Sequence, residues 1–368
     1  MQYKTIRFSR THQIEFISDL KKQVKNYFDQ NSISTYANSQ MVIKTIVMFA
    51  LYFVPYFLMV LGVVTNIWVV LAMWTVMGIG NTGIGLSIMH DANHGAYSKN
   101  KYVNKYLSYV MNLIGANSFI WKIQHNVLHH SFTNIEGMDE DIDPGPLMRL
   151  SPHAPLLKAH KHQHIYGWFL YGLMTFLWLT TKDFRQLARY KKLGLMKTQK
   201  RSFRSVLTEA ILSKIFYYGY ALIIPLVFIQ APWYIILIGF FIMHFITGLS
   251  LGLIFQPAHV MPSAEFPVPD KDSSVENNWA VHQLFTTTNF APKSKVFSWF
   301  VGGLNYQIEH HLFPNICHVH YKKISEIVKA KTEEYGLPYY SQETFYAAVR
   351  EHAKMLKQLG QGNHQIAS

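Results

Sequence analysis

The chain has 368 residues, of which 49% are hydrophobic, and its 34 Lys and Arg against 21 Asp and Glu give a net charge of +13. A basic chain that is half apolar is typical of a membrane protein with cationic faces. No zinc-finger, helix-turn-helix or RNA-binding signature is visible, so we expect no nucleic-acid partner. The single cysteine, Cys317, excludes an intrachain disulfide, a cysteine-rich zinc site and a cysteine-ligated iron–sulfur cluster.

The N-terminal segment, residues 1–40, is polar and mixed in charge. A signal peptide needs an apolar core near its start, which this segment lacks. We therefore expect residues 1–40 to form a cytoplasmic segment ahead of the main domain.

Four apolar segments are long enough to cross a membrane, because a helix of about 20 residues spans a hydrocarbon core of roughly 30 Å. They are residues 42–62, 66–88, 209–229 and 233–255. A fifth apolar segment, residues 165–180, is rich in aromatic side chains but shorter.

Three histidine clusters lie around these segments. On a helix, positions i and i+4 share one face, so His90/His94 and His125/His129 can each direct two imidazoles to one point. The clusters are His90-Asp91-Ala92-Asn93-His94, His125-Asn126-Val127-Leu128-His129-His130 and Gln307-Ile308-Glu309-His310-His311.

Imidazole-rich sites without thiolates suit zinc, copper, iron or nickel. The three clusters supply seven histidines, which is too many for one tetrahedral zinc and suits two metals with open positions. His259 follows the last apolar segment and is a candidate eighth ligand, although a lone histidine there is as often structural. His244 is the only histidine well inside a span, which disfavours a metal transporter with ligands near the midplane.

A single metal centre requires all three clusters on one side of the membrane, so an even number of crossings must separate them. We therefore expect residues 165–180 to be an interfacial helix or a buried cap. The turns around 61–66 and 230–232 contain no Lys or Arg, and all 34 basic residues fall on the other side. This asymmetry predicts that the metal site and both termini face the cytoplasm.

The expected fold is therefore all-α. We expect an integral membrane four-helix bundle with a cytoplasmic helical cap that carries the di-metal site. Residues 41–330 would form this domain, and residues 331–368 a cytoplasmic C-terminal helical tail.

Three charged segments leave alternatives open. The basic run 182–205 could anchor on anionic lipid, or dock an acidic electron donor or substrate phosphates. The acidic residues 139–143 could be a carboxylate metal site, but a solvated loop, or one that orders the second cluster, is favoured. The basic, histidine-rich stretch 153–164 could contact a headgroup or phosphate.

The chain resembles the membrane fatty acid desaturase family from about residue 40 to about residue 330. The resemblance rests on the motifs His-Asp-Ala-Asn-His-Gly at 90–95, Gln-His-Asn-Val-Leu-His-His at 124–130, Asp-Glu-Asp-Ile-Asp-Pro at 139–144 and Gly-Gly-Leu-Asn-Tyr-Gln-Ile-Glu-His-His-Leu-Phe-Pro at 302–314. In most desaturases the third histidine cluster, called the third box, begins with a histidine. Gln307 stands at that position here, and this replacement is typical of the front-end branch.

The resemblance implies a centre of two irons. Its ligands would be His90, His94, His125, His129, His130, His310 and His311. His259 matches an additional ligand of related desaturases, and Gln307 would bind weakly or lie beside the metals. Among the ligands lie Asp91, Asn93, Asn126 and Glu309, which could fix imidazole orientations or be solvated.

The implied activity is an oxidoreductase reaction. O2 and electrons would be used to insert a cis double bond into a fatty acyl chain, held as acyl-CoA or in a lipid. The sixth carbon, as in a linoleoyl-type reaction, is favoured over the fifth. The sequence contains no His-Pro-Gly-Gly haem motif of a fused cytochrome b5. Electrons would then come from a separate donor such as a ferredoxin or cytochrome b5. A related sphingolipid desaturase or a hydroxylase is the alternative.

Overall fold

The computed structural model describes residues 6–10 and 13–363. Within these residues the chain forms two compact units. Unit 1 comprises Ser39–Ile123 and Trp168–Gly252, and unit 2 comprises the described residues up to Asn38 together with Gln124–Gly167 and those from Leu253 onward.

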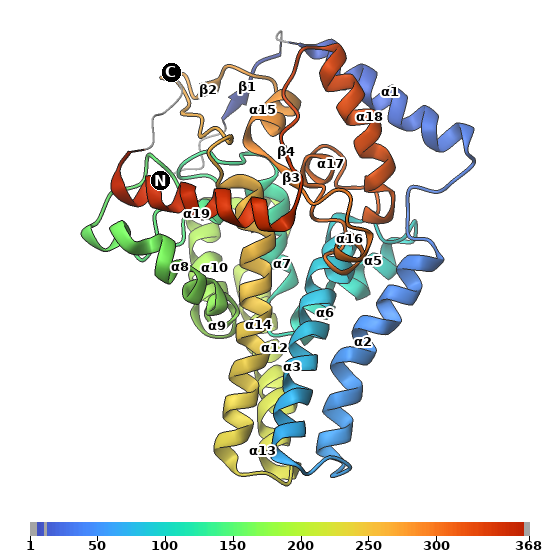
Figure 1. Ribbon diagram of the computed structural model, residues 1–368, viewed down its shortest axis with the longest axis vertical. Helices are drawn as coiled ribbons and strands as arrows, with labels where there is room; N and C mark the ends of the chain where they lie inside the picture. Colours follow the sequence, from blue (N-terminus) through green and yellow to red (C-terminus); the bar gives the residue numbers. More distant parts are fainter. Residues whose placement is uncertain (1–5, 11–12, 364–368) are drawn as a thin grey trace. The chain divides into compact units, whose positions relative to one another are not determined.

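Unit 1 contains long apolar helices. Four continuous helical stretches are long and apolar enough to cross a membrane, namely Ser39–Val60, Ile67–His94, Phe203–Phe228 and Trp233–His259. The four expected spans, and with them the all-α membrane fold class, are thereby confirmed (Figure 1). The stretches are built from α2 (Ser39–Val60), α3 (Ile67–Gly83), η1 (Ile84–Met89), α4 (His90–His94), α12 (Phe203–Tyr218), η6 (Gly219–Ile223), α13 (Ile224–Phe228) and α14 (Trp233–His259).

Shorter helices complete unit 1. They are α5 (Lys101–Ser108), α6 (Val110–Leu113), α7 (Ser118–Lys122), α9 (Met174–Leu177), η5 (Trp178–Lys182), α10 (Asp183–Lys192) and α11 (Leu195–Thr198). The apolar segment 165–180 is therefore broken into several pieces and is not among the four candidate spans. Its location at a membrane interface stays a prediction.

Glycines bring the long helices of unit 1 together. A Cβ at Gly80 of α3 would lie 2.7 Å from the backbone nitrogen of Tyr52 in α2, so the two backbones pack directly. At Gly248 of α14 a Cβ would lie 2.6 Å from the carbonyl oxygen of Gly172. These approaches explain why small residues lie inside otherwise bulky apolar helices.

One cation is buried within α12. Lys214 has its Nζ 2.8 Å from Oδ2 of Asp183 in α10, and it also donates to the carbonyl of Trp178. A buried charge is tolerated where it is paired and its remaining donors are bonded. The pair therefore ties α12 to the start of α10.

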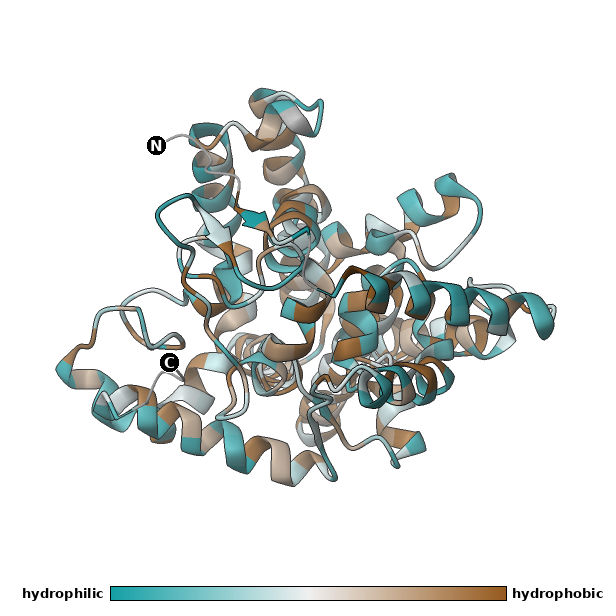
Figure 2. Ribbon diagram, turned by 90° about the horizontal axis from the view of Figure 1, so that it is seen from above, coloured by the Kyte–Doolittle hydropathy of each residue, from teal (hydrophilic) through white to brown (hydrophobic). Residues whose placement is uncertain are grey.

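Unit 2 has a core of its own, in which α1 (Ile14–Gln30) packs against α18 (Tyr321–Glu334) (Figure 1). Phe16 and Leu20 of α1 are fully buried in one apolar cluster with Ile324 and Val328 of α18. Figure 2 shows helices that carry both hydrophilic (teal) and hydrophobic (brown) residues, as amphipathic helices do. The N-terminal and C-terminal segments thus both contribute to unit 2.

The remaining elements of unit 2 are short except α19. They are η2 (Ile123–His129), η3 (Glu140–Ile142), η4 (Lys158–His162), α8 (Gln163–Gly172), α15 (Trp279–Thr286), α16 (Lys295–Phe300), α17 (Gln307–Leu312), η7 (His318–His320) and α19 (Phe345–Gln361). Ile123 of η2 and Trp168–Gly172 of α8 belong to unit 1. Two parallel strand pairs join distant segments: β1 (Arg7–Phe8) with β2 (Ser274–Val275), and β3 (Asn289–Phe290) with β4 (Ser341–Gln342).

Candidate metal centre

The second histidine cluster lies on a π-helix, η2, rather than an α-helix. The N–H of His130 donates to the carbonyl of His125, five residues earlier, at 3.0 Å. This i+5 bonding turns His125 and His130 toward one another, with their Nε2 atoms 3.2 Å apart. The segment is a π-helix rather than the expected α-helix, but the rings of His125 and His129 still lie together, with centroids 5.2 Å apart.

One group of imidazoles consists of His129, His259 and His311, whose ligand atoms lie within 4.8 Å of one another. Each comes from a different element: η2, the end of α14 and α17. The ring centroids of His129 and His259 lie 4.7 Å apart, and that of His311 lies 4.8–4.9 Å from both. We call this set the first imidazole group.

The outer nitrogens of the first imidazole group are all held by acceptors. His129 Nδ1 lies 3.1 Å from both oxygens of Asp139, and His259 Nδ1 donates to the carbonyl of Thr286 at 3.1 Å. His311 Nδ1 lies 2.7 Å from Oε1 of Gln283. Metal-binding histidines characteristically donate their second ring N–H to a carboxylate or carbonyl, which leaves Nε2 for the metal.

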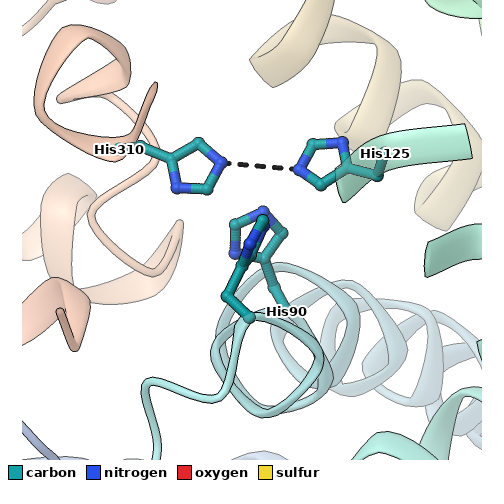
Figure 3. Close-up of side chains that lie close together, drawn as sticks. His90, His125 and His310 are labelled. Atoms are coloured by element: carbon teal, nitrogen blue, oxygen red, sulfur yellow. Dashed lines mark hydrogen bonds between the residues drawn. The ribbon is translucent and has the colours of Figure 1, made fainter. Parts of the chain in front are cut away.

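The second imidazole group consists of His125, His130 and His310. Their three Nε2 atoms lie 2.9 to 3.4 Å apart, and Figure 3 marks the contact between His125 and His310. Neutral imidazoles carry one N–H each, so three mutually close Nε2 atoms are poorly explained as hydrogen bonds alone. Nitrogens about 2.1 Å from a shared metal would lie about 3.0–3.4 Å apart, which matches this spacing.

Gln307, at the start of α17, is 1% exposed. Both polar atoms of its side-chain amide are buried without a hydrogen-bond partner, as is Nε2 of His259. Buried polar atoms are nearly always paired, so these orphaned atoms require an explanation. A metal ion bound by His259 and lying near Gln307 provides one, and the imidazole donor set fits such an ion.

In unit 1, His90 and His94 form the expected i, i+4 pair on α4. Their ring centroids lie 4.8 Å apart, and Trp121 presents an edge-on ring to both, at 5.7 and 6.1 Å. Asp91 has a carboxylate oxygen 3.9 Å from Nδ1 of His90. Asn93 accepts a hydrogen bond from Ser118, so the two polar residues inside this cluster are buried rather than solvated.

Two carboxylates, those of Asp139 and Asp141, favour a positive charge on His129 of the second cluster. Burial opposes a positive charge on His129, but Asp139 and Asp141 raise its pKa to about 9. Burial also opposes the negative charge of Asp139, but His129 and two backbone N–H groups lower its pKa. The pair therefore stabilises a carboxylate directly behind an imidazole ring.

Glu309, between Gln307 and His310, is fully buried. Its two oxygens accept hydrogen bonds from Nδ2 of Asn289, at 2.8 Å, and from the hydroxyl of Tyr339, at 3.0 Å. Burial raises its pKa to about 7, while these hydrogen bonds oppose the rise. Glu309 thus fastens α17 to β3 and to the segment that precedes β4.

The structure decides between some alternatives for the polar segments. Asp139 is 1% exposed and orders the second cluster, whereas Asp143 is exposed. His160 contacts the carbonyl of Pro146 and His153 that of Phe266, so these two histidines have structural partners. Our sequence analysis did not single out Gln283 or Thr286, which follow no recognisable motif.

Comparison with known proteins agrees with this geometry. Residues 66–343 match the family model described as fatty acid desaturase. The chain is 35% identical to an sn-1 linoleoyl-lipid 6-desaturase of Arthrospira platensis, over 94% of this chain and 93% of the relative. It is 32% identical to the Synechocystis protein of the same name, over 97% and 99%, and 34% identical to an acyl-lipid (8-3)-desaturase of Physcomitrium patens, over 97% and 74%.

The family match covers all three histidine clusters and His259, and the similar relatives extend over almost the whole chain. The four candidate spans fit a multi-pass membrane protein. The chain therefore belongs to the fatty acid desaturase family, in its front-end branch, and is an oxidoreductase of lipid metabolism.

Proposed function

We propose that this protein inserts a cis double bond into a lipid-linked fatty acyl chain, between the carboxyl end and an existing double bond. The sixth carbon of a linoleoyl chain is the proposed position, since two relatives that match over 93% or more of their length are named sn-1 linoleoyl-lipid 6-desaturases. The observation that carries the proposal is the pair of buried imidazole groups with Gln307 in the third box.

The proposed cofactor is a pair of iron ions. The proposed ligands are the histidines of the three clusters and His259, with Gln307 beside the first imidazole group. The full set is His90, His94, His125, His129, His130, His259, His310 and His311. Iron when bound would supply the oxidising power for a reaction in which –CH2–CH2–, O2, two electrons and two protons give –CH=CH– and two waters.

The protein's own residues position the reaction. Asp139, Thr286 and Gln283 fix the rings of the first imidazole group through Nδ1, so that Nε2 points inward. The burial of both groups excludes bulk water from the centre. Glu309 fixes the position of α17, which carries the third histidine cluster, through its hydrogen bonds to Asn289 and Tyr339.

The electrons would come from a separate donor, for which a ferredoxin or a cytochrome b5 is proposed. The lack of Lys and Arg in the turns 61–66 and 230–232 supports a cytoplasmic location for the histidine clusters and for both termini. Such a donor would then approach from the cytoplasmic side.

The test is fatty acid analysis of a host that expresses the chain and is fed linoleate. We expect a product with one additional double bond on the carboxyl side, at the sixth carbon. The His310→Ala/His311→Ala variant should give no product. His352→Asn is the matched control, because His352 is buried outside the clusters and uses Nδ1 to contact the carbonyl of Val260. An oxygenated product would instead identify a hydroxylase.

A further inference from the structure

Most of the positive charge of the chain belongs to unit 1. Its two stretches of sequence contain 15 Lys and Arg but only three Asp and Glu. Asp183 and Glu209 are each paired with a cation at 2.8 Å, and Asp91 is buried beside His90. Most cations of unit 1 therefore have no acidic residue of that unit to pair with.

Six exposed cations of unit 1 lie on one short segment, which runs from α10 through α11 to the first turn of α12. We call them the cationic surface; they are Arg185, Lys191, Lys192, Lys197, Lys200 and Arg204. The two acidic residues of the segment do not offset this charge, because Asp183 is buried against Lys214 and Glu209 is bonded to Arg201. The exposed charge of the segment is therefore of one sign.

The cationic surface lacks the apolar side chains of a helix that inserts into a bilayer. The described side chains of residues 182–210 include no exposed large hydrophobic one, whereas Phe169 and Leu177 in the preceding segment are exposed. Leu187 and Tyr190 on the apolar face of α10 are buried, and α10 packs on α12 and α7 (Figure 1). Helices that lie in a membrane interface expose an apolar face beside their cations, so these features favour a soluble protein as the partner.

The cationic surface also lies near a pair of candidate metal ligands in unit 1. Lys182, directly before α10, has its Nζ 5.1 Å from the ring centroid of Trp178. Trp178 packs against an apolar cluster that contains Trp121, and Trp121 contacts the rings of His90 and His94. Two indole rings therefore connect the start of this segment to the histidine pair of α4.

We propose that the cationic surface is the docking site of a reduced electron-carrier protein with an acidic face. The inference rests on the proposed function, since each double bond consumes two electrons from a separate donor. Two one-electron carriers, each oxidised by one electron, would supply them. With two protons and O2, these electrons convert –CH2–CH2– into –CH=CH– and two waters. A surface of one sign speeds the capture of a carrier of the opposite sign and fixes its orientation.

The first experiment measures binding without turnover. The full-length protein in neutral detergent is titrated at low salt with an oxidised acidic two-iron ferredoxin, and separately with a soluble cytochrome b5 haem domain. We expect Lys192→Glu/Lys197→Glu to weaken binding of at least one carrier about tenfold, whereas Lys192→Arg/Lys197→Arg should retain it. The difference should vanish in about 1 M salt, where the Debye length is about 3 Å.

Lys322→Glu/Lys357→Glu is the matched control, because it changes the net charge equally at two exposed lysines of unit 2. It should leave the affinity for the carrier near that of the wild type. The proposal is overturned if neither carrier binds the wild type. It is also overturned if this control weakens binding as much as Lys192→Glu/Lys197→Glu does, because the carrier would then respond to overall charge and not to this surface.

The rival occupant is an anionic lipid headgroup, which basic residues beside membrane spans also attract. Native mass spectrometry of the wild type and of both Glu variants, equilibrated with phosphatidylglycerol, counts the lipid molecules that each protein retains. We expect equal retention in the wild type and in Lys192→Glu/Lys197→Glu. Loss of retained lipid in that variant, with unchanged affinity for the carriers, would overturn the proposal and identify a headgroup site.

The second experiment measures how the variant behaves during turnover. With O2 and substrate held constant, Lys192→Glu/Lys197→Glu should raise KM for the carrier about tenfold and leave kcat at saturating carrier unchanged. The product of a single turnover started with dithionite should match that of the wild type, since this small reductant needs no docking surface. An equal loss with dithionite would show that the substitutions disturb the centre itself and would contradict a docking role.

The dithionite arm also separates the two proposals. If dithionite-reduced wild-type protein forms no double bond while the carriers bind the cationic surface as described, the proposed function fails and the docking site stands. If the double bond forms and Lys192→Glu/Lys197→Glu changes neither the affinity nor KM for the carrier, the docking site fails alone.

Discussion

Both carboxylate oxygens of Asp139 lie 3.1 Å from Nδ1 of His129, so Asp139 orients this imidazole ring. The two residues are ten positions apart in the sequence. The same carboxylate accepts the backbone N–H groups of Asn134 and Asp141, each at 2.9 Å. Asp139 therefore organises the loop after the second cluster as well as the imidazole. Asp139 acts on the imidazole of His129, while Asp141, with Oδ2 3.5 Å from the same Nδ1, lies among groups that could hold a metal ion together with His125 and His129.

Replacing Asp139 with Asn should weaken metal binding while preserving the fold. The amide keeps the size of the side chain but removes the negative charge that favours N–H on Nδ1. Loss of such a partner typically lowers metal affinity about 10- to 100-fold. Iron content after dialysis against graded chelator measures the effect. Asp143→Asn, at an exposed position of the same segment, should retain wild-type iron; equal loss in both variants would refute the assignment.

His259→Asn should remove a metal ligand without disturbing the surrounding hydrogen bonds. The Asn amide can replace Nδ1 as the donor to the carbonyl of Thr286 but offers nothing at the position of Nε2. We expect a lower iron stoichiometry and a loss of activity no smaller than the roughly 10- to 100-fold typical of removing a partner that only orients a ligand. The corresponding His352→Asn variant keeps its bond to Val260 by the same geometry and should bind iron normally. Iron content like that of the wild type in His259→Asn would show that this histidine is structural.

The sequence alone predicted the four spans because length and apolarity suffice to recognise them. It predicted the histidine clusters because their spacing is visible. It could not predict which of the six imidazoles of unit 2 belong to the first imidazole group and which to the second. The reason is that η2 is a π-helix, in which the N–H of His130 bonds to the carbonyl of His125, five residues earlier. The sequence also could not predict that α1 packs on α18. An amphipathic pattern indicates that a helix has a buried face, but not which distant helix covers that face.

Gln307→Leu separates a role at the metal from a role in packing. Neither polar atom of this amide has a hydrogen-bond partner, so the metal-free protein should lose nothing when it is replaced by an apolar group of similar size. We expect the melting temperature of the metal-free protein to stay the same or rise, and the activity of the iron-loaded protein to fall. Thermal scans with and without iron, beside product analysis, provide the measurement. A large drop in the metal-free melting temperature would contradict a role for Gln307 at the metal.

Gly80→Ala should destabilise unit 1, although alanine is the better helix former. The added Cβ would lie 2.7 Å from the backbone nitrogen of Tyr52 and 2.9 Å from the carbonyl carbon of Leu51, and a backbone cannot rotate aside as a side chain can. Forcing α2 and α3 apart in this way costs about 1–3 kcal/mol. Gly219→Ala is the control, because no atom lies within 4 Å of its Cβ position, and alanine should there stabilise the helix by up to about 1 kcal/mol. Melting temperatures of the two variants should therefore shift in opposite directions, and a shift in the same direction would mean that helix propensity, rather than the approach of α2 to α3, governs both positions.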